Sequence, residues 1–169
     1  MKLLVVRHGE AEDKDKFART GKSDDLRPLT PAGKREMRDV AGGIREIVSA
    51  IDALLTSPLV RAMQTAAIVG EEYDRDPVKV EWLRPEAPYE DFARWAQSSR
   101  EKQTVAIVGH EPHLSGLVSW LLAGAEDSFV ELKKGAACLL EIEEENAGPS
   151  SAMLVWSMAP KHLRAIGRG

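Results

Sequence analysis

An arginine and a histidine stand side by side at the end of an apolar run near the start of the chain. Residues 3–6 are leucine and valine, and Arg7, His8 and Gly9 follow them. A guanidinium can bind two oxygens of one phosphoryl group, and a neutral imidazole can attack phosphorus. The glycine permits the sharp turn that such a site needs. This tripeptide alone is also compatible with an ordinary polar turn after a strand.

Two further groups of the same kind follow other predicted strands. Residues 104–108 are as apolar as residues 3–6, and His110 comes directly after them. Residues 52–58 predict a short strand and a turn, so Arg61 lies in the first turn of the next helix. A cation there opposes the helix macrodipole, at a cost of about 0.3–1 kcal/mol, unless an anion binds at the same terminus. One histidine at a strand end is most simply a capping or packing residue. Two histidines and two arginines at three strand ends indicate a shared anion site.

The segments between these groups predict the elements that position them. Strands are expected at 3–6, 52–56, 78–83 and 104–108, because these runs are short, apolar or alternating. Helices are expected from Pro31 to Val48, with Thr30 as the cap, and over 59–69, 89–99 and 114–122. We expect Val60, Met63 and Ala67 to face the sheet, with Ile68 as a further candidate. Ligands of such α/β proteins bind at the carboxyl ends of the strands.

The last third of the chain predicts strands instead of helices. Runs at 129–132, 137–142 and 152–158 have strand composition, and the turn at 143–149 joins the last two. Such a short connection fits an antiparallel hairpin, since parallel neighbours need a longer crossover. His162 lies in a basic terminal segment that we interpret as a solvated tail. The sequence therefore predicts a three-layer α/β/α domain, with a mostly parallel central sheet and a C-terminal hairpin at its edge.

Composition limits the class of protein. The 169 residues suit a single domain over 1–169, with 43% hydrophobic and 30% charged residues. A net charge of −4 disfavours a nucleic-acid partner but not a small anionic ligand. We find no signal peptide pattern and no apolar run approaching the ~20 residues of a membrane helix, so we expect a cytoplasmic protein without a membrane partner. We also expect a monomer.

The only cysteine is Cys138, which lies in the apolar run 136–140. One cysteine excludes an internal disulfide and a cysteine-based zinc cage. We interpret Cys138 as a buried core thiol. A long polar stretch, 11–29, follows the first strand and has two open interpretations: a functional lid or binding loop, and a mobile solvated loop.

Three segments together resemble the histidine phosphatase superfamily, which includes the phosphoglycerate-mutase-like enzymes. They are residues 7–10, residues 57–66 and residues 108–112. Residues 27–33 and the short chain are most similar to its small SixA-type branch, the phosphohistidine phosphatases. The resemblance runs from near the first residue to past residue 112.

The resemblance implies roles for the matching residues. His8 would be the nucleophile that becomes phosphorylated, and Arg7, Arg61 and His110 would surround the phosphoryl oxygens. Water would then hydrolyse the phosphoenzyme. Gly9 and Ser57 are further candidates for phosphate binding. These roles need no metal and no cofactor, because positioning and charge stabilisation provide most of the catalysis of phosphoryl transfer.

The acid that protonates the leaving group departs from the family pattern. Larger members take a carboxylic acid from an inserted segment, which is short here. Glu86 is the candidate by its order along the chain, and an exposed loop glutamate between two prolines is an equal interpretation. His110 is the alternative donor. A phosphohistidine substrate has a weaker P–N bond and an imidazole leaving group, so it needs less acid assistance.

Three functions remain open at this point. The favoured one is a metal-independent phosphatase acting on a phosphorylated histidine-containing protein through phospho-His8. The second is a phosphomonoesterase of the same mechanism that acts on a small phosphoester. The third is a non-catalytic module that binds phosphate or a phosphoprotein, which the complete set of nucleophile and cations disfavours.

Overall fold

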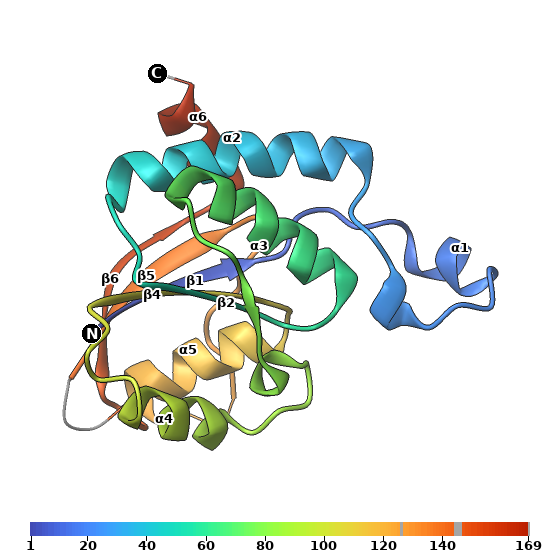
Figure 1. Cartoon of the computed structure of the whole chain (residues 1–169). Coiled ribbons are helices and arrows are strands. Elements are labelled where there is room, and N and C mark those ends of the chain that lie inside the picture. The colour runs from blue at the N-terminus through green and yellow to red at the C-terminus, as the bar shows by residue number, and fades with distance from the viewer. Residues whose placement is uncertain (126, 144–146, 169) are drawn as a thin grey trace.

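The computed structural model describes residues 1–125, 127–143 and 147–168. These residues form a six-stranded sheet between two layers of helices (Figure 1). The strands are β1 (Lys2–Arg7), β2 (Ala53–Thr56), β3 (Val78–Lys79), β4 (Thr104–Gly109), β5 (Ala137–Ile142) and β6 (Ala152–Met158). Their order is β3-β2-β4-β1-β5-β6. The first four strands are parallel to one another, whereas β5 is antiparallel to β1 and β6 is antiparallel to β5. The predicted α/β fold with a C-terminal hairpin at the sheet edge is confirmed.

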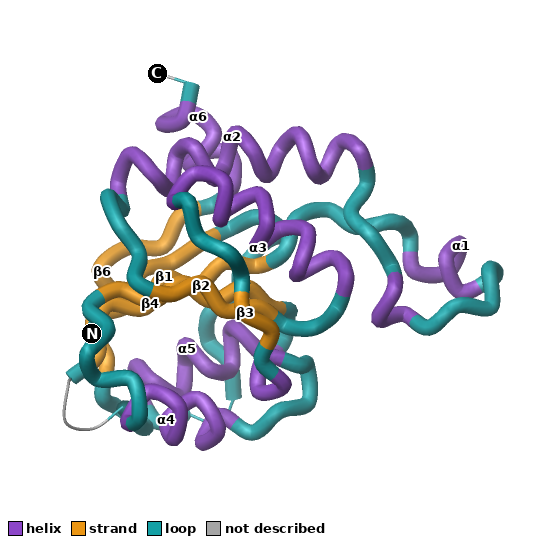
Figure 2. The backbone as a smooth tube through the Cα atoms, viewed as in Figure 1, coloured by secondary structure: helices purple, strands orange, loops and turns teal. Residues whose placement is uncertain are grey.

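Helices cover both faces of the sheet (Figure 2). One layer consists of α2 (Pro31–Ile47), α3 (Val60–Tyr73) and α6 (Pro160–Gly167), and the other of α4 (Tyr89–Gln97) and α5 (His113–Ala123). Alternate residues of β1 enter the two layers: Leu4 and Val6 face the first core, and Leu3 and Val5 the second. A strand buried on both faces must be apolar throughout, which explains the continuous run at 3–6.

The stretch 11–29 projects from the body and carries α1 (Lys14–Ala18) and the 3₁₀ turn η1 (Asp24–Leu26) (Figure 1). Its two ends are held together, because Ala11 and Leu29 form a bridge and the Glu12 N–H donates to the Pro28 carbonyl at 2.9 Å. Phe17 is its buried anchor. The base of this segment therefore has a fixed place beside β1.

The strand predicted over 78–83 is wrong beyond residue 79. Only Val78 and Lys79 pair with β2, opposite Leu55 and Thr56. Because β2 ends at Thr56, the following residues have no partner strand. They turn into η2 (Glu81–Leu83), another 3₁₀ turn, which buries Leu83 in the core beneath the sheet.

The strand predicted over 129–132 is also wrong. The strand β1, inside the sheet, is already paired on both sides by β4 and β5 and offers no free edge to this segment. The segment is instead a loop in which Phe129 is 61% exposed and Leu132 is buried. The hydroxyl of Ser119 accepts a hydrogen bond from the Phe129 N–H at 3.1 Å and holds the loop on α5.

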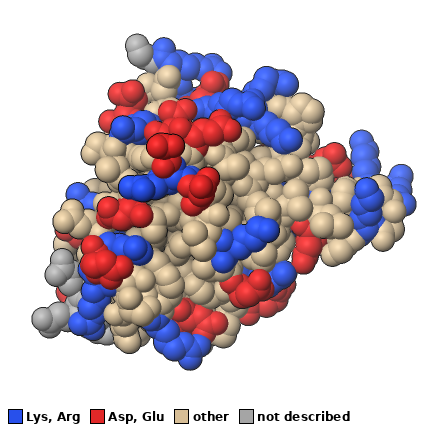
Figure 3. Space-filling view, in the orientation of Figure 1, with Lys and Arg blue, Asp and Glu red and all other residues tan. Residues whose placement is uncertain are grey.

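The predicted solvated tail is a helix. Pro160 begins α6, and Leu163 is fully buried against α2. A Cβ atom at Gly43 of α2 would overlap the carbonyl of Leu163, so the glycine permits this close approach. His162 is exposed, as expected. Lysines and arginines, with acidic neighbours, line the outer surface of α2 and α6 (Figure 3).

The predicted inner face of α3 is wrong by about one residue, except at Ile68, which is buried. Val60, Met63 and Ala67 are half-buried or exposed. The buried residues of α3 are instead Arg61, Ala62, Thr65, Ala66, Ile68, Val69 and Gly70. The small Ala62 and Ala66 let the helix lie close to the sheet, and this rotation carries Arg61 and Thr65 inward to the strand ends.

Cys138 is fully buried on β5, as predicted, and burial raises the pKa of its thiol to about 12. The thiol is therefore protonated and unreactive at neutral pH. Among the residues that the structure describes, no helix is both long and apolar enough to cross a membrane.

Candidate active site

The site forms where three adjacent parallel strands end. β1 lies beside β4, and β4 lies beside β2, so their carboxyl ends meet at one edge of the sheet. The N–H of His8 donates to the Gly109 carbonyl at 3.1 Å, and the N–H of Ser57 donates to the Val108 carbonyl at 3.0 Å. Because of this register, the polar residues that follow β1, β2 and β4 lie next to one another at the same edge of the sheet.

His8 is held in the tautomer that a nucleophile requires. Its side chain is 6% exposed, and its Nδ1 lies 2.7 Å from the carbonyl oxygen of Gly9. Because a carbonyl only accepts, Nδ1 carries the proton and Nε2 keeps a free lone pair. Burial, together with the smaller effects of the charges of Arg61, Arg7 and Arg27, lowers the pKa of His8 to about 4 against the opposing effect of the Gly9 bond. His8 is therefore neutral at pH 7.

His110 faces His8, with ring centroids 5.1 Å apart. Its Nε2 lies 2.8 Å from the hydroxyl oxygen of Ser57, which is fully buried. Burial, together with the smaller effect of the neighbouring His8, lowers the pKa of His110 to about 2. Ser57, a candidate phosphate ligand in the sequence, is thus a direct partner of His110. When Ser57 donates its hydroxyl proton to Nε2, the proton of His110 resides on Nδ1.

Arg61 reaches the same place from the first turn of α3. Its side chain is 7% exposed, and burial lowers its pKa. One terminal nitrogen donates to the Asp24 carbonyl at 3.0 Å, and the other lies 3.2 Å from the Asp24 carboxylate. The buried cation at a helix N-terminus, unfavourable by itself, is compensated here by an anionic side chain from the projecting segment.

Several buried nitrogens of the site have no partner among the described residues. They are Nε of Arg7, Nε of Arg61 and Nδ1 of His110; two atoms further along the chain, Oε1 of Glu111 and Nδ1 of His113, share this property. Arg7 uses one terminal nitrogen to donate to the Leu132 carbonyl at 2.7 Å. Buried polar groups are nearly always hydrogen-bonded, so unpartnered donors beside His8 indicate a place for an anion.

Gly9 connects the site to α3. Its N–H donates to the hydroxyl of Thr65 at 3.1 Å, and that hydroxyl donates to the Arg61 carbonyl at 2.9 Å. The amide of Gly9 is therefore already used, and its contact with phosphate stays a prediction. A Cβ atom at this position would lie 2.5 Å from Cγ of Met37, so glycine is required where α2 crosses the turn.

Glu86 lies on the loop between η2 and α4 and is exposed. Its negative charge acts on His113, whose pKa it raises against the stronger lowering by burial. The Nε2 of His113 lies 3.1 Å from the Ala87 carbonyl and holds this loop against α5. Glu86 thus belongs to the same end of the molecule as His110, and its role as proton donor stays a prediction.

Two residues with a part in the site received no role from the sequence. Arg27 lies in the resemblance segment 27–33, and its charge lowers the pKa of His8. Its Nε lies 2.7 Å from the Asp24 carboxylate, and it also donates to the Glu12 carbonyl at 2.8 Å. An arginine just before the proline-rich start of α2 was the available signal for Arg27. Nothing in the sequence distinguishes Asp24 from the other acidic residues of the polar stretch.

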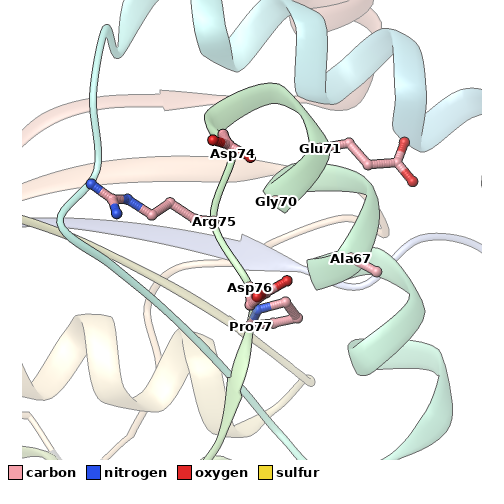
Figure 4. Close-up of a pocket in the computed structure, with 7 residues that line it drawn as sticks. All are labelled: Ala67, Gly70, Glu71, Asp74, Arg75, Asp76 and Pro77. Atoms are coloured by element: carbon pink, nitrogen blue, oxygen red, sulfur yellow. The ribbon is translucent and has the colours of Figure 1, made fainter.

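A cavity of about 380 Å³ lies elsewhere, at the C-terminal end of α3 (Figure 4). It is lined by Ala67, Gly70, Glu71, Asp74, Arg75, Asp76 and Pro77. Its first lining residue, Ala67, lies about 9 Å along α3 from Arg61, at a rise of about 1.5 Å per residue, and the other lining residues lie further along the chain. Within the described ranges, no three His, Cys, Asp or Glu side chains gather as a metal site would require.

The fold and the site together define an α/β protein with paired imidazoles and arginines around an anion-binding position. The family model of the histidine phosphatase superfamily (branch 1) matches residues 3–92. The chain belongs to the histidine phosphatase superfamily. The predicted resemblance is confirmed.

Individual relatives support the SixA-type branch. The phosphohistidine phosphatase SixA of Escherichia coli is 27% identical over 97% of both chains. An uncharacterized protein of Picosynechococcus is 31% identical over 79% of this chain and 81% of its own length. The solved structure of the protein histidine phosphatase SixA complexed with tungstate matches with a TM-score of 0.81 and 25% identity, over 96% of this chain and 99% of that one.

Proposed function

We propose that this chain is a metal-independent phosphatase that removes the phosphoryl group from phosphohistidine in proteins. The observation that carries the proposal is the state of His8, whose Nδ1–H is bound by the Gly9 carbonyl and whose Nε2 is free. Arg61, Arg7 and His110 lie around this nucleophile, and a full-length relative carries the name phosphohistidine phosphatase.

In the proposed reaction, the Nε2 lone pair of His8 attacks phosphorus while the P–N bond of the substrate breaks. The bonding electrons leave with the imidazole of the substrate. Water then attacks phospho-His8, inorganic phosphate departs, and the lone pair returns to Nε2. Charge-assisted hydrogen bonds from Arg7 and Arg61 to the phosphoryl oxygens would contribute about 1.5–3 kcal/mol each.

The leaving imidazole needs a proton on one of its nitrogens. A substrate ring protonated at its distal nitrogen leaves directly as neutral imidazole. Otherwise His110 is the candidate donor, since a bound phosphoryl dianion 4–6 Å from an imidazole favours its protonated form. Glu86 is the second candidate, and it would matter more for an ester substrate, whose alkoxide is a poorer leaving group.

The test compares turnover on a phosphorylated histidine-containing protein domain with turnover on a panel of sugar phosphates. We expect the phosphoprotein to be preferred, and His8→Ala to lose at least a thousandfold in kcat while it still binds inorganic phosphate. His162→Ala changes an exposed histidine of α6 and is the matched control, which should keep full activity. Preference for a sugar phosphate would identify the small-molecule phosphomonoesterase instead. Unchanged turnover in His8→Ala would refute the mechanism.

Radiolabelled substrate provides the second readout. Rapid quenching should trap acid-labile, alkali-stable phosphate on the wild-type chain, and none on His8→Ala. Binding of phosphate without turnover by the wild-type chain would identify a non-catalytic binding module.

A further inference from the structure

A carboxylate from the projecting segment lies against the cations of the phosphoryl site. One oxygen of Asp24 lies 3.2 Å from a terminal nitrogen of Arg61, and the other lies 2.7 Å from Nε of Arg27. The carbonyl of Asp24 accepts a second bond from Arg61 at 3.0 Å. Asp24 belongs to η1, whereas Arg61 begins α3, so only the folded chain brings them together.

The contact between Asp24 and Arg61 weakens the binding of a phosphoryl dianion at the same site. The Asp24 charge stabilises the buried guanidinium of Arg61 and acts on His110 as well, which places a negative charge near the paired imidazoles. A phosphoryl group that approaches the same arginines meets this charge at short range. The Arg61 end of this contact is buried and the Asp24 side chain is 41% exposed, so solvent and salt screen the repulsion only in part.

Asp24 is also more exposed than the nucleophile of the proposed reaction. His8 is 6% exposed, whereas the Asp24 side chain is 41% exposed, so part of the carboxylate is in contact with solvent. In-line displacement directs the leaving group away from the attacking nitrogen. Because His8 is buried, the leaving group would depart toward solvent, and the partly exposed carboxylate of Asp24 is the anion held by Arg61 and Arg27 that it would meet there.

We propose that Asp24 is a specificity-determining residue that selects phosphoryl compounds whose leaving group carries no negative charge. This inference rests on the proposed function and narrows it. The imidazole of phosphohistidine within a polypeptide is neutral or cationic, so Asp24 does not repel it. Phosphorylated carboxylic acids and sugar bisphosphates carry a second anion near the reacting group and are disfavoured.

The experiment uses two small substrates that differ by one charge. N-acetyl-phosphohistidine has a free carboxylate, and its N-methylamide has none, while the leaving imidazole is the same. At low ionic strength the wild-type chain should prefer the methylamide about tenfold in kcat/KM. Asp24→Asn should reduce this preference to about twofold or less.

Asp25→Asn is the matched control, because Asp25 is the next residue and pairs with Arg84 at 3.0 Å instead of with Arg61 or Arg27. The Asp25 charge also acts on Arg61, but less than the charge of Asp24 does. This variant should keep the wild-type preference. A preference that Asp24→Asn leaves unchanged overturns the proposal, including the case in which both substrates lose activity equally. An equal loss of preference in Asp25→Asn also overturns the proposal, because the preference would then depend on the net charge of the segment and not on Asp24 itself.

Binding of inorganic phosphate separates this proposal from the proposed function. Titration calorimetry should give about tenfold tighter phosphate binding for Asp24→Asn than for wild type, with Asp25→Asn unchanged. If neither histidine phosphate is hydrolysed, the proposed function fails, and the phosphate titration still tests Asp24. Equal or weaker phosphate binding by Asp24→Asn contradicts its role as a repelling charge.

Discussion

The N–H of Gly9 and the hydroxyl of Thr65 form a 3.1 Å hydrogen bond that joins the turn after β1 to the first half of α3. The same hydroxyl donates to the Arg61 carbonyl. One small side chain therefore links the residue beside His8 to Arg61, whose guanidinium lies in the candidate site. Neither partner is charged, and both are buried, so the link is insensitive to salt.

Thr65→Val should destabilise the fold by about 1–3 kcal/mol, because it leaves the buried N–H of Gly9 without an acceptor. Urea unfolding measures this difference in stability. The value of kcat should also fall, because the turn after β1 is no longer held in place against α3. Thr65→Ser, which keeps the hydroxyl, should recover most of both losses. Full activity and stability in Thr65→Val would show that the bond is dispensable.

Ser57→Ala should lower kcat about tenfold with little change in KM. The serine hydroxyl is the partner of His110 Nε2, and its loss frees the ring to rotate and to change tautomer. Ser119→Ala is the control, since Ser119 is equally buried but bonds the Phe129 N–H in the loop on α5. An equal fall in kcat for both variants would contradict a specific role of Ser57.

Stability should depend on pH through the buried imidazole of His8. Its pKa is about 4 in the folded chain and about 6.5 when unfolded, so between these values only the unfolded chain binds the proton. This contribution to stability is complete above pH 6.5 and is lost as the pH falls toward 4. For His8 alone the loss is about 3 kcal/mol.

Urea unfolding from pH 4.5 to 7.5 measures this dependence. His8→Gln should have a shallower pH profile than wild type, and the exposed His162→Gln should follow the wild-type profile. Parallel profiles for wild type and His8→Gln would contradict a depressed pKa at His8. Because neutral His8 persists below pH 6.5, we also expect kcat/KM to remain high at pH 5.5.

Adjacent glycines in α2 should respond in opposite directions to alanine. At Gly42 the nearest atom to a new Cβ is 4.0 Å away, so Gly42→Ala should stabilise the helix by about 0.5–1 kcal/mol. At Gly43 the new Cβ meets the carbonyl of Leu163, so Gly43→Ala should destabilise by about 1–3 kcal/mol. Thermal unfolding of the two variants makes the comparison. Equal effects would mean that α6 does not pack closely on α2.

The residues that carry chemistry were predictable because they follow the strongest signals of the sequence. An apolar run with its own polar terminus predicts a buried strand and its carboxyl end from local information alone. Arg7, His8 and His110 follow such runs directly. Arg61 follows a weaker strand, but its unfavourable place at a helix N-terminus identified it. The sequence alone therefore predicts that the two histidines lie close together.

The errors occur where distant partners decide the local structure. Residues 80–83 have a strand-like pattern, but β2 is too short to pair with them, and residues 129–132 find β1 already paired on both sides. The terminal segment becomes α6 because Gly43 leaves room for it on α2. In each case the deciding factor was the length or packing of an element elsewhere in the chain.

The order of residue types by itself determined the α/β architecture, the strand ends that bear imidazole and guanidinium groups, and the membership of a phosphatase superfamily. Tertiary structure alone decided which polar atoms meet: Gly9 with Thr65, Ser57 with His110, and Asp24 with Arg61. Hydrophobic periodicity is a local property that the chain displays along its length. A hydrogen bond or an ion pair depends on two atoms within about 3 Å, and only packing sets that separation.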